Sequence, residues 1–384
     1  MSETPTGFVH EGQFDIQTHI WYTFRVMNKD LKERTLAELE QIVVHLGQKK
    51  YVAEYIFHFI HVEGATEIAQ ITPLSKAFRK QLTDQGYYIS RLAIANKLTD
   101  KDDTAKYVFT LGDGSRIETV MLLDDGRKTL CVSTQVGCAL GCLFCATGRL
   151  GFSRNLTAAE IVDQVNLVER DASCVARSNH AIRNTHDAGR ITNVVYMGMG
   201  EPLLNYRAVV KSVSILNHPK GKNIGIRHIT ISTCGIAPAI RKLASEDLHS
   251  KLAVSLNAPD DALRTRLMPI NAKYPLAELL KAVRFYQDRT RQRVSFEYVM
   301  IKGLNDSPAH ARTLVNLLRG LMCHVNLIEH NPHRGCEFAG SSSERIKQFA
   351  SVLERAGIET TVRFRMGRGI RAACGQLGAD WLDS

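Results

Sequence analysis

The sequence predicts an α/β protein in which a parallel sheet follows a small helical region. Short apolar strands alternate with helices from about residue 157 onward. Such alternation is typical of parallel sheets whose strands are joined by helices, in an open sheet or a closed barrel. Nearer the start, apolar residues recur at helical spacing between residues 35 and 86. The 384 residues suffice for two or three domains, or for one large barrel with an added region.

The first expected elements are three helices, in which apolar residues return every three or four positions. Their ranges are 35–46, 51–62 and 74–86. Four short strands follow, with Asp113-Gly114 and Asp125-Gly126 as turn signals between them. These strands are expected at 91–97, 105–111, 116–123 and 128–133. We therefore divide the chain into a helical accessory domain at 1–90, a β linker segment at 91–123, and the main α/β domain at 124–384.

Six pairs of a helix and a strand make up the rest of the prediction. They are 157–169 with 192–197, 206–217 with 227–232, 236–245 with 251–256, 276–289 with 293–300, 308–320 with 323–328, and 343–356 with 359–365. The polar and basic stretch 171–190 is expected to be a loop. Because functional sites in parallel α/β folds lie at the carboxyl ends of the strands, polar residues there are the first candidates for a site.

Charge and composition narrow the class of partner. The 49 Lys and Arg exceed the 39 Asp and Glu, which gives a formal net charge of +10. This excess favours a polyanionic partner such as RNA, although a basic enzyme without such a partner has the same composition. No stretch is apolar for long enough to span a membrane, and the polar start of the chain does not resemble a signal peptide. We therefore expect a cytoplasmic protein whose cysteines are mostly reduced.

Three cysteines with short spacing form the strongest local signal. Cys138, Cys142 and Cys145 have the spacing C-x3-C-x2-C, with Gly137 and Gly141 between or before them. One loop can wrap such thiolates around a metal centre, and glycines give it the backbone freedom that this needs. Three ligands leave one iron of a four-iron cluster open to a substrate. The alternative is a zinc-stabilised RNA-binding module, but its fourth ligand does not follow soon after Cys145.

This segment resembles the radical-SAM superfamily signature, and the wider sequence resembles the RlmN/Cfr adenine methyltransferases, with the RlmN branch closer. The matching motifs extend from about residue 30 to the end of the chain. They are CVSTQVGCALGCLFCATG at 131–148, GFSRNL at 151–156, MGMGEPLLN at 197–205, ISTCGI at 231–236, LMPIN at 267–271, VNLIEHNP at 325–332 and AACGQL at 372–377. The resemblance implies a partial (βα)6 barrel, similar to a TIM barrel, as the catalytic domain at 124–384, with a C-terminal cysteine loop.

The resemblance also implies a [4Fe-4S] cluster on Cys138, Cys142 and Cys145, and S-adenosylmethionine (SAM) as the second cofactor. The residues expected to contact SAM all follow strands, and each has a simpler explanation as a turn or a strand-end cap. They are Gly200, Glu201, Ser232, Ser255, Leu256, Asn257 and Asn331. Asn257 departs from the family, in which we expect histidine at this position.

Three further residues resemble the catalytic groups of the family. Cys374 is similar to the cysteine that accepts a methyl group from a first SAM and later carries it to adenine after a second SAM is cleaved. Cys131 resembles the cysteine that resolves the resulting protein–RNA link through a transient disulfide. Glu118 resembles the proton acceptor. In isolation, each cysteine would be taken for a small buried apolar residue and Glu118 for a surface residue. Four other cysteines have no role that we can assign: Cys174, Cys234, Cys323 and Cys336.

The substrate implied by the resemblance is an adenine in 23S rRNA, and a second substrate in tRNA is left open. Methylation at carbon 2 is the leading expectation, and methylation at carbon 8 is the alternative. The basic residues expected near RNA phosphates are Lys49, Lys50, Arg177, Arg183, Arg190, Arg363, Arg365 and Arg368. The family further implies a flavodoxin-type electron donor and a monomeric enzyme. One departure concerns the RNA target, since Gly369-Ile370-Arg371 stands where relatives have Asp-Ile-Asp before the reactive cysteine.

Overall fold

A computed structural model describes residues 28–124, 126–178, 189–363 and 366–382 of the chain. Ten strands form one sheet in the order β1-β2-β3-β4-β7-β8-β9-β10-β11-β12. Their bounds are β1 Ala93–Thr99, β2 Ala105–Thr110, β3 Arg116–Asp124, β4 Arg127–Cys131, β7 Asn193–Tyr196, β8 Ile229–Thr233, β9 Lys251–Ser255, β10 Val294–Met300, β11 Cys323–Glu329 and β12 Glu359–Arg363. The strands from β4 to β12 run parallel, whereas β1, β2 and β3 are antiparallel to their neighbours.

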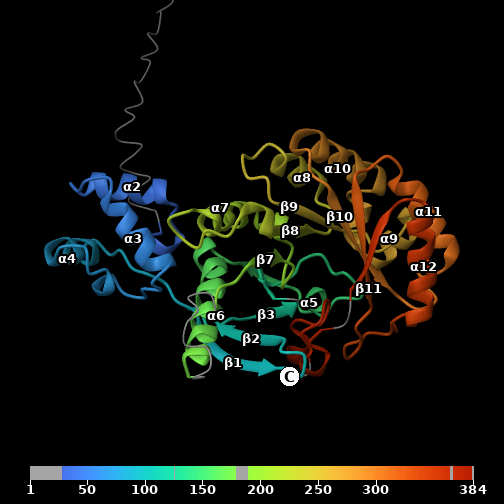
Figure 1. Ribbon diagram of the computed structural model, residues 1–384, viewed down its shortest axis with the longest axis horizontal. Helices are drawn as coiled ribbons and strands as arrows, with labels where there is room; N and C mark the ends of the chain where they lie inside the picture. Colours follow the sequence, from blue (N-terminus) through green and yellow to red (C-terminus); the bar gives the residue numbers. More distant parts are fainter. Residues whose placement is uncertain (1–27, 125, 179–188, 364–365, 383–384) are drawn as a thin grey trace, which may run out of the picture.

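Helices connect the parallel strands and cover one side of the sheet (Figure 1). They are α6 Ala158–Ser178, α7 Tyr206–Asn217, α8 Ala237–Leu243, α9 Asp261–Leu267, α10 Leu276–Thr290, α11 Pro308–Leu318 and α12 Ser343–Arg355. Six strand–helix connections follow one another from β4 to β12, which confirms the expected partial (βα)6 barrel. Among the described residues, the sheet has β1 at one edge and β12 at the other.

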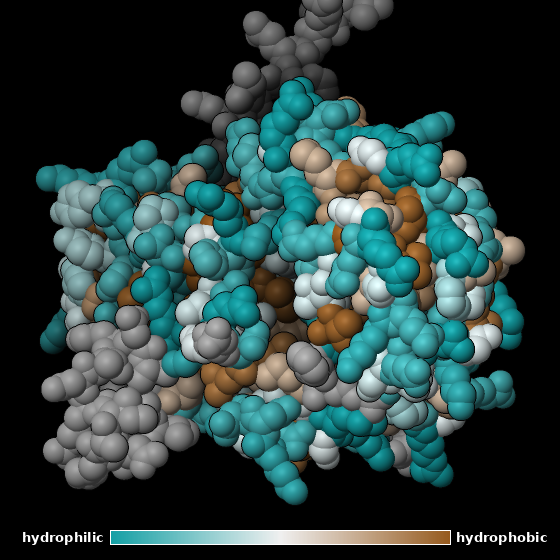
Figure 2. Space-filling model, turned by 45° about the vertical axis from the view of Figure 1, so that its right-hand side comes forward, coloured by the Kyte–Doolittle hydropathy of each residue, from teal (hydrophilic) through white to brown (hydrophobic). Residues whose placement is uncertain are grey.

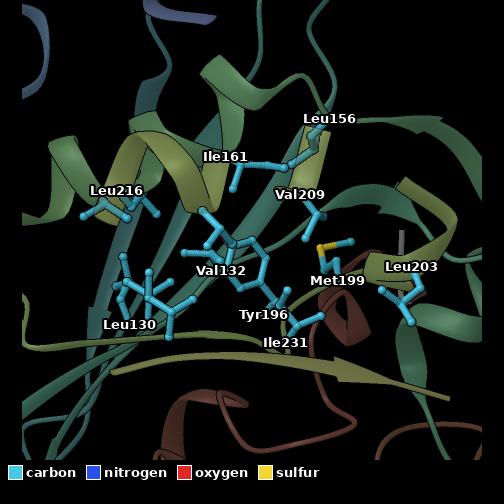
Figure 3. Close-up of a cluster of buried hydrophobic side chains, with 14 of the residues drawn as sticks. Leu130, Val132, Leu156, Ile161, Tyr196, Met199, Leu203, Val209, Leu216 and Ile231 are labelled. Atoms are coloured by element: carbon cyan, nitrogen blue, oxygen red, sulfur yellow. The ribbon is translucent and has the colours of Figure 1, made fainter. Parts of the chain in front are cut away.

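A cluster of apolar side chains joins this sheet to its covering helices (Figure 3). Tyr196 and Ile231 come from the sheet, and Ile161, Val209 and Leu216 come from α6 and α7. All five side chains are at most 1% exposed. Since a fully buried side chain of this size contributes about 1.5–3 kcal/mol, this cluster helps to fix the sheet against the helices.

The N-terminal domain is helical, as expected, and it contacts the barrel through buried charges. Its helices are α2 Leu36–His45, α3 Val52–His61 and α4 Lys76–Asp84. Thr35 and Glu38 form a capping box that fixes the start of α2. The buried Lys32 ammonium lies 2.5 Å from the Asp163 carboxylate of α6, and Lys211 of α7 lies 2.7 Å from Glu38. The accessory domain is therefore held on the α6 and α7 side of the barrel, as Figure 1 shows.

Three local features add to the sequence prediction or differ from it. The β linker segment predicted at 91–123 contains β1 to β3, and because β3 pairs with β4, these strands continue the main sheet. Helix α6 extends to Ser178, so the first part of the expected loop at 171–190 is helical. A short hairpin of β5 Gln135–Gly137 and β6 Phe152–Asn155, together with the small helix α5 Ala146–Arg149, was not predicted. In the described part of the chain, every helix is too short or too polar to cross a bilayer.

Candidate functional site

The strand register places most of the predicted site residues on one face of the sheet. Partners in register point to the same face, and side chains alternate between faces along each strand. Val120 pairs with Cys131, which places Cys131 and Glu118 on the face opposite the helices. Ser232 pairs with Ala253, and Ser255 pairs with Glu297, so both serines lie on this inner face as well. The inner face therefore brings together residues from β3 to β9 that are far apart in sequence.

The cysteine loop is folded by the β5–β6 hairpin. The backbone of Gly137 has a φ of +74°, and a Cβ atom there would lie 1.9 Å from the Gly151 carbonyl oxygen. Only glycine fits this close approach. The Cys138 N–H donates to the same carbonyl at 2.7 Å, so the hairpin sets the position of the first cysteine. Cys145 then caps the start of α5, which directs the chain toward the C-terminal segment.

Burial dominates the chemistry of Cys138 and Cys145. Burial, together with the neighbouring thiols, raises the pKa of Cys138 to about 12 and that of Cys145 to about 11. Such thiols stay protonated at neutral pH unless a bound cation stabilises their thiolates. In the described residues, no three Cys, His, Asp or Glu side chains lie close enough to hold a single metal ion. The three thiols lie close enough to interact electrostatically, and cysteine thiolates are the usual ligands of iron–sulfur clusters, so the donor set fits a cluster.

A fourth cysteine, which the sequence analysis left without a role, lies beside this group. The Cys234 thiol makes a hydrogen bond with the Cys142 thiol, and this contact and burial raise the pKa of Cys234. Its backbone carbonyl accepts a 2.7 Å hydrogen bond from the buried Arg264 guanidinium. The sequence contains a signal that could have identified Cys234 as a candidate, namely its position just after the end of β8. Ser232 on the same strand was already a candidate.

Gly200 and Glu201 form a tight turn above the sheet. Gly200 has a φ of +98°, and a Cβ atom there would lie 2.5 Å from the Cβ atom of Gln135. The buried Glu201 carboxylate accepts two backbone N–H groups, from Leu203 at 3.0 Å and from Cys234 at 2.7 Å. Burial raises the pKa of Glu201, and these two hydrogen bonds lower it. Glu201 therefore joins the turn to the segment after β8, where the side chains of Thr233 and Cys234 also form hydrogen bonds with its carboxylate.

The remaining expected SAM contacts differ in what they can offer a ligand. Leu256 and Asn257 are buried, and the Asn257 side chain is used within the protein, where it accepts from the Val299 N–H at 2.9 Å. Asn257 also adopts a left-handed φ of +59°, which asparagine tolerates well. Asn331 is different, because its Nδ2 donates to the Cys374 carbonyl at 3.3 Å and its buried Oδ1 has no partner. That oxygen is free to accept a hydrogen bond from a bound molecule.

Cys131 and Cys374 lie near each other on the inner side of the sheet. Each is buried enough for its pKa to be raised, and the proximity of Cys374 contributes to the raised pKa of Cys131. The Arg363 guanidinium opposes this rise at both thiols. The Cys374 side chain is nevertheless accessible to solvent. A thiol on a concave surface can have a raised pKa and still be accessible to solvent. Figure 2 shows one face of the molecule with a hollow near its middle, lined by apolar residues.

Glu118 is buried and attached to the segment that carries Cys374. Its side chain is 1% exposed, so the expectation of a surface residue is wrong for this strand position. The carboxylate accepts a 2.8 Å hydrogen bond from the Gly378 N–H and lies 3.1 Å from the Lys106 ammonium. Burial raises the pKa of Glu118 more than these two contacts lower it. A carboxylate with a raised pKa is a better proton acceptor than an ordinary one.

The C-terminal segment also contacts the cysteine loop directly. The Ala146 N–H donates to the Gly375 carbonyl at 2.8 Å, and the Thr147 hydroxyl donates to the Leu377 carbonyl at 2.7 Å. The three candidate cluster ligands and the Cys131–Cys374 pair therefore belong to one site. Among the basic residues expected at the RNA, Lys50 pairs with Glu40 at 3.0 Å, whereas Arg183, Arg365 and the Arg177 side chain lie outside the described residues.

Comparison with known proteins gives the family. Residues 29–87 match the model of the ribosomal RNA large subunit methyltransferase N-terminal domain, and residues 177–314 match that of the radical SAM superfamily. The probable dual-specificity RNA methyltransferase RlmN of Thermoanaerobacter sp. (strain X514) is 45% identical over 92% of this chain and 98% of its own length. The dual-specificity RNA methyltransferase RlmN of Syntrophobacter fumaroxidans is 44% identical over 91% of this chain and 98% of its own.

A solved structure agrees with these relatives. The radical SAM methyltransferase from Sphaerobacter thermophilus has a TM-score of 0.83 and 45% identity, and the match covers 92% of this chain and 100% of that one. These comparisons confirm the expected family, enzyme class and pair of cofactors. The chain therefore belongs to the RlmN family of radical-SAM RNA methyltransferases, which use S-adenosylmethionine and a [4Fe-4S] cluster.

Proposed function

We propose that the enzyme methylates carbon 2 of an adenine in 23S rRNA, and in tRNA as a second substrate, with Cys374 as the methyl carrier. The observation that supports this most directly is the position of Cys374, which lies near Cys131 and on the segment whose Gly378 N–H binds Glu118. An acceptor thiol, a resolving thiol and a proton acceptor are the three groups that such a reaction needs from the protein.

The bound cofactors would supply a methyl group and a carbon-centred radical, and two SAM molecules would be used in each turnover. Cys138, Cys142 and Cys145 would hold the cluster. Around SAM, the unpartnered Oδ1 of Asn331 would accept a hydrogen bond, and Glu201 and Ser232 would contribute polar contacts at the carboxyl ends of β7 and β8. The Gly200 turn would let the cofactor approach the backbone closely.

The residues of this chain have distinct tasks in the proposed reaction. Cys374 takes a methyl group as a thioether and becomes linked to the adenine carbon through that group. Glu118 takes the proton from the modified carbon. The electron left on the linked adenine would return to the bound cluster. Cys131 then attacks the Cys374 sulfur as a thiolate, the bond between that sulfur and the methylene carbon breaks, the carbon takes up a proton to become the methyl group, and a disulfide between the two cysteines remains. The target adenine must be unpaired or flipped out to reach this site, and helices α2 to α4 would hold the surrounding RNA.

The decisive experiment is anaerobic incubation of the reconstituted enzyme with methyl-labelled SAM, a reductant, and unmodified rRNA or tRNA fragments. Nucleosides are then separated and identified by mass spectrometry. The proposal expects 2-methyladenosine, whereas 8-methyladenosine would instead support the Cfr-like alternative, which shares all the cysteines. If SAM is cleaved but no methyladenosine forms, the substrate is a different one. A flavodoxin-type electron donor, a monomeric state and a cytoplasmic location complete the proposal.

A further inference from the structure

A buried lysine on a neighbouring strand faces the Glu118 carboxylate. Lys106 lies on β2, is 1% exposed, and has its ammonium 3.1 Å from Glu118 Oε1. Lys106 pairs in register with Val120, so it lies on the same inner face as Glu118 and Cys131. Nothing in the sequence indicates that Lys106 is buried, because a lysine at the start of a short strand is most often a solvated residue.

The same ammonium also binds the C-terminal segment. Lys106 Nζ lies 2.8 Å from Asp380 Oδ2, and Asp380 Oδ1 accepts a 2.8 Å hydrogen bond from the Arg371 guanidinium. Glu118 accepts from the Gly378 N–H of that segment at 2.8 Å. The two carboxylates therefore share one buried lysine, and both contact the segment that begins with Cys374.

These contacts have an electrostatic consequence for a proton acceptor. Glu118 is buried on all sides, and a carboxylate taken out of water tends to become protonated and so to lose its ability to accept a proton. A lysine at 3.1 Å favours the charged form, whereas the negative charge of Asp380 disfavours it. Within the part of the chain that the structure describes, the charged groups that act on Glu118 are Lys106 from β2 and Asp380 from the C-terminal segment.

We propose that Lys106 is a positioning residue of the methyl-transfer reaction, which keeps the Glu118 carboxylate charged and aimed at the carbon that loses its proton. The proton moves from that carbon to a Glu118 oxygen, and the electron pair of the C–H bond stays with the ring. Lys106 does not exchange a proton in this step. The inference rests on the proposed function, because it assumes that Glu118 is the proton acceptor.

The test is the pH dependence of methyladenosine formation under single-turnover conditions, with 5′-deoxyadenosine measured in the same samples. Loss of Lys106 in Lys106→Gln raises the pKa of Glu118, so less of the carboxylate is charged near neutral pH. An opposite charge at this distance typically changes a pKa by about one to three, so the acid limb of the profile of rate against pH is expected to move to higher pH by about that amount. The rate should recover as the pH rises, whereas 5′-deoxyadenosine formation should change little.

Two control variants separate charge from structure. Lys106→Arg keeps the charge and should retain the pH profile of the parent enzyme. Lys97→Gln removes a lysine from the adjacent strand β1, where it pairs with Asp171 of α6 at 2.7 Å, and should also leave the profile unchanged. A Lys106→Gln profile that equals that of the parent, or a loss of rate that is the same at every pH, would overturn the inference.

A second variant keeps the inference testable if Lys106→Gln fails to fold. Asp380→Asn removes the competing anion, so it should lower the pKa of Glu118 and increase the rate on the acid side of the profile. No change, or a change in the opposite direction, would contradict the inference. The proposed function is judged separately, by whether mass spectrometry finds a methyl group on Cys374 of the parent enzyme.

Discussion

Asp100 accepts a hydrogen bond from the backbone N–H of Gly369 at 2.8 Å, which ties the β1–β2 turn to the segment before Cys374. Asp102 does the same for the Gly367 N–H at 2.9 Å. A Cβ atom at position 369 would lie 2.8 Å from the Asp100 carboxylate. We expect an acidic residue at position 369 in relatives. In this chain, Asp100 lies so close to Gly369 that a second aspartate at position 369 would clash with it.

Gly369→Asp is accordingly expected to weaken this contact, because it adds both a clash and a like charge beside Asp100. The loss should be about 1–3 kcal/mol of local stability, together with slower methyl loading of Cys374. Hydrogen exchange of residues 366–380 and the methyl content of Cys374 measure the two effects. The double variant Asp100→Gly/Gly369→Asp removes the clash but also the Asp100–Gly369 hydrogen bond, so it should recover part of both losses; if it behaves like the single variant, the clash with Asp100 is not the cause.

Gly137→Ala should prevent the cysteine loop from forming. The new Cβ would lie 1.9 Å from the Gly151 carbonyl oxygen, which backbone movement must relieve. We expect a large loss of iron after anaerobic reconstitution, measured as iron and sulfide per chain, with an intact barrel by circular dichroism. Gly114→Ala is the matched control, since that glycine also has a positive φ of +83° but has open space around it. Equal iron content in the two variants would contradict this account of the hairpin.

The Cys374 thiol should react slowly with iodoacetamide at neutral pH, although it is accessible. Burial raises its pKa, so the thiol form persists at neutral pH and the reactive thiolate is scarce. Below the pKa, the rate of alkylation should increase about tenfold for each increase of one in pH. Mass spectrometry of the tryptic peptide measures the rate, with the urea-unfolded chain as reference. A folded-state rate at pH 7 equal to that of the unfolded chain would show that Cys374 is not shielded.

Leu216→Ala tests the apolar cluster between α7 and the sheet. Leu216 is fully buried in this cluster, so the substitution leaves a cavity and should lower the free energy of unfolding by about 2–5 kcal/mol. Denaturant titration of the apoprotein measures the change. Val44→Ala is the control, because Val44 is 56% exposed and its loss should cost much less. Similar losses for both variants would mean that Leu216 is not part of a rigid core.

The sequence predicts the parallel strands and their helices because each has a clear apolar period and a turn signal at its ends. It misses the β5–β6 hairpin, because Gln135–Gly137 is too short to show a period and is held by pairing with residues that follow the cysteines. Helix α6 is longer than predicted since its last turns are polar, and composition alone does not distinguish a polar helix from a loop.

The site is harder to predict than the fold, because its contacts join residues far apart in the chain. Cys138 is identified by its spacing from Cys142 and Cys145, whereas Cys131 and Cys374 are identified only through the family motifs around them. Lys106 has no such signal, and the contacts of Lys106 and Cys234 depend on which face of a strand meets the C-terminal segment or on what lies beside a strand end. Those contacts are fixed by the register of the whole sheet, which the local pattern does not contain.

The contacts of Glu118 and Lys106 with Gly378 and Asp380 span 260 and 274 positions of the chain, respectively. During synthesis, β2 and β3 leave the ribosome long before their partners in the C-terminal segment exist. The nascent chain can fold its helical domain and most of its sheet while Cys131 still lacks the thiol with which it is proposed to react. The pair of cysteines that is proposed to react is thus assembled late in synthesis.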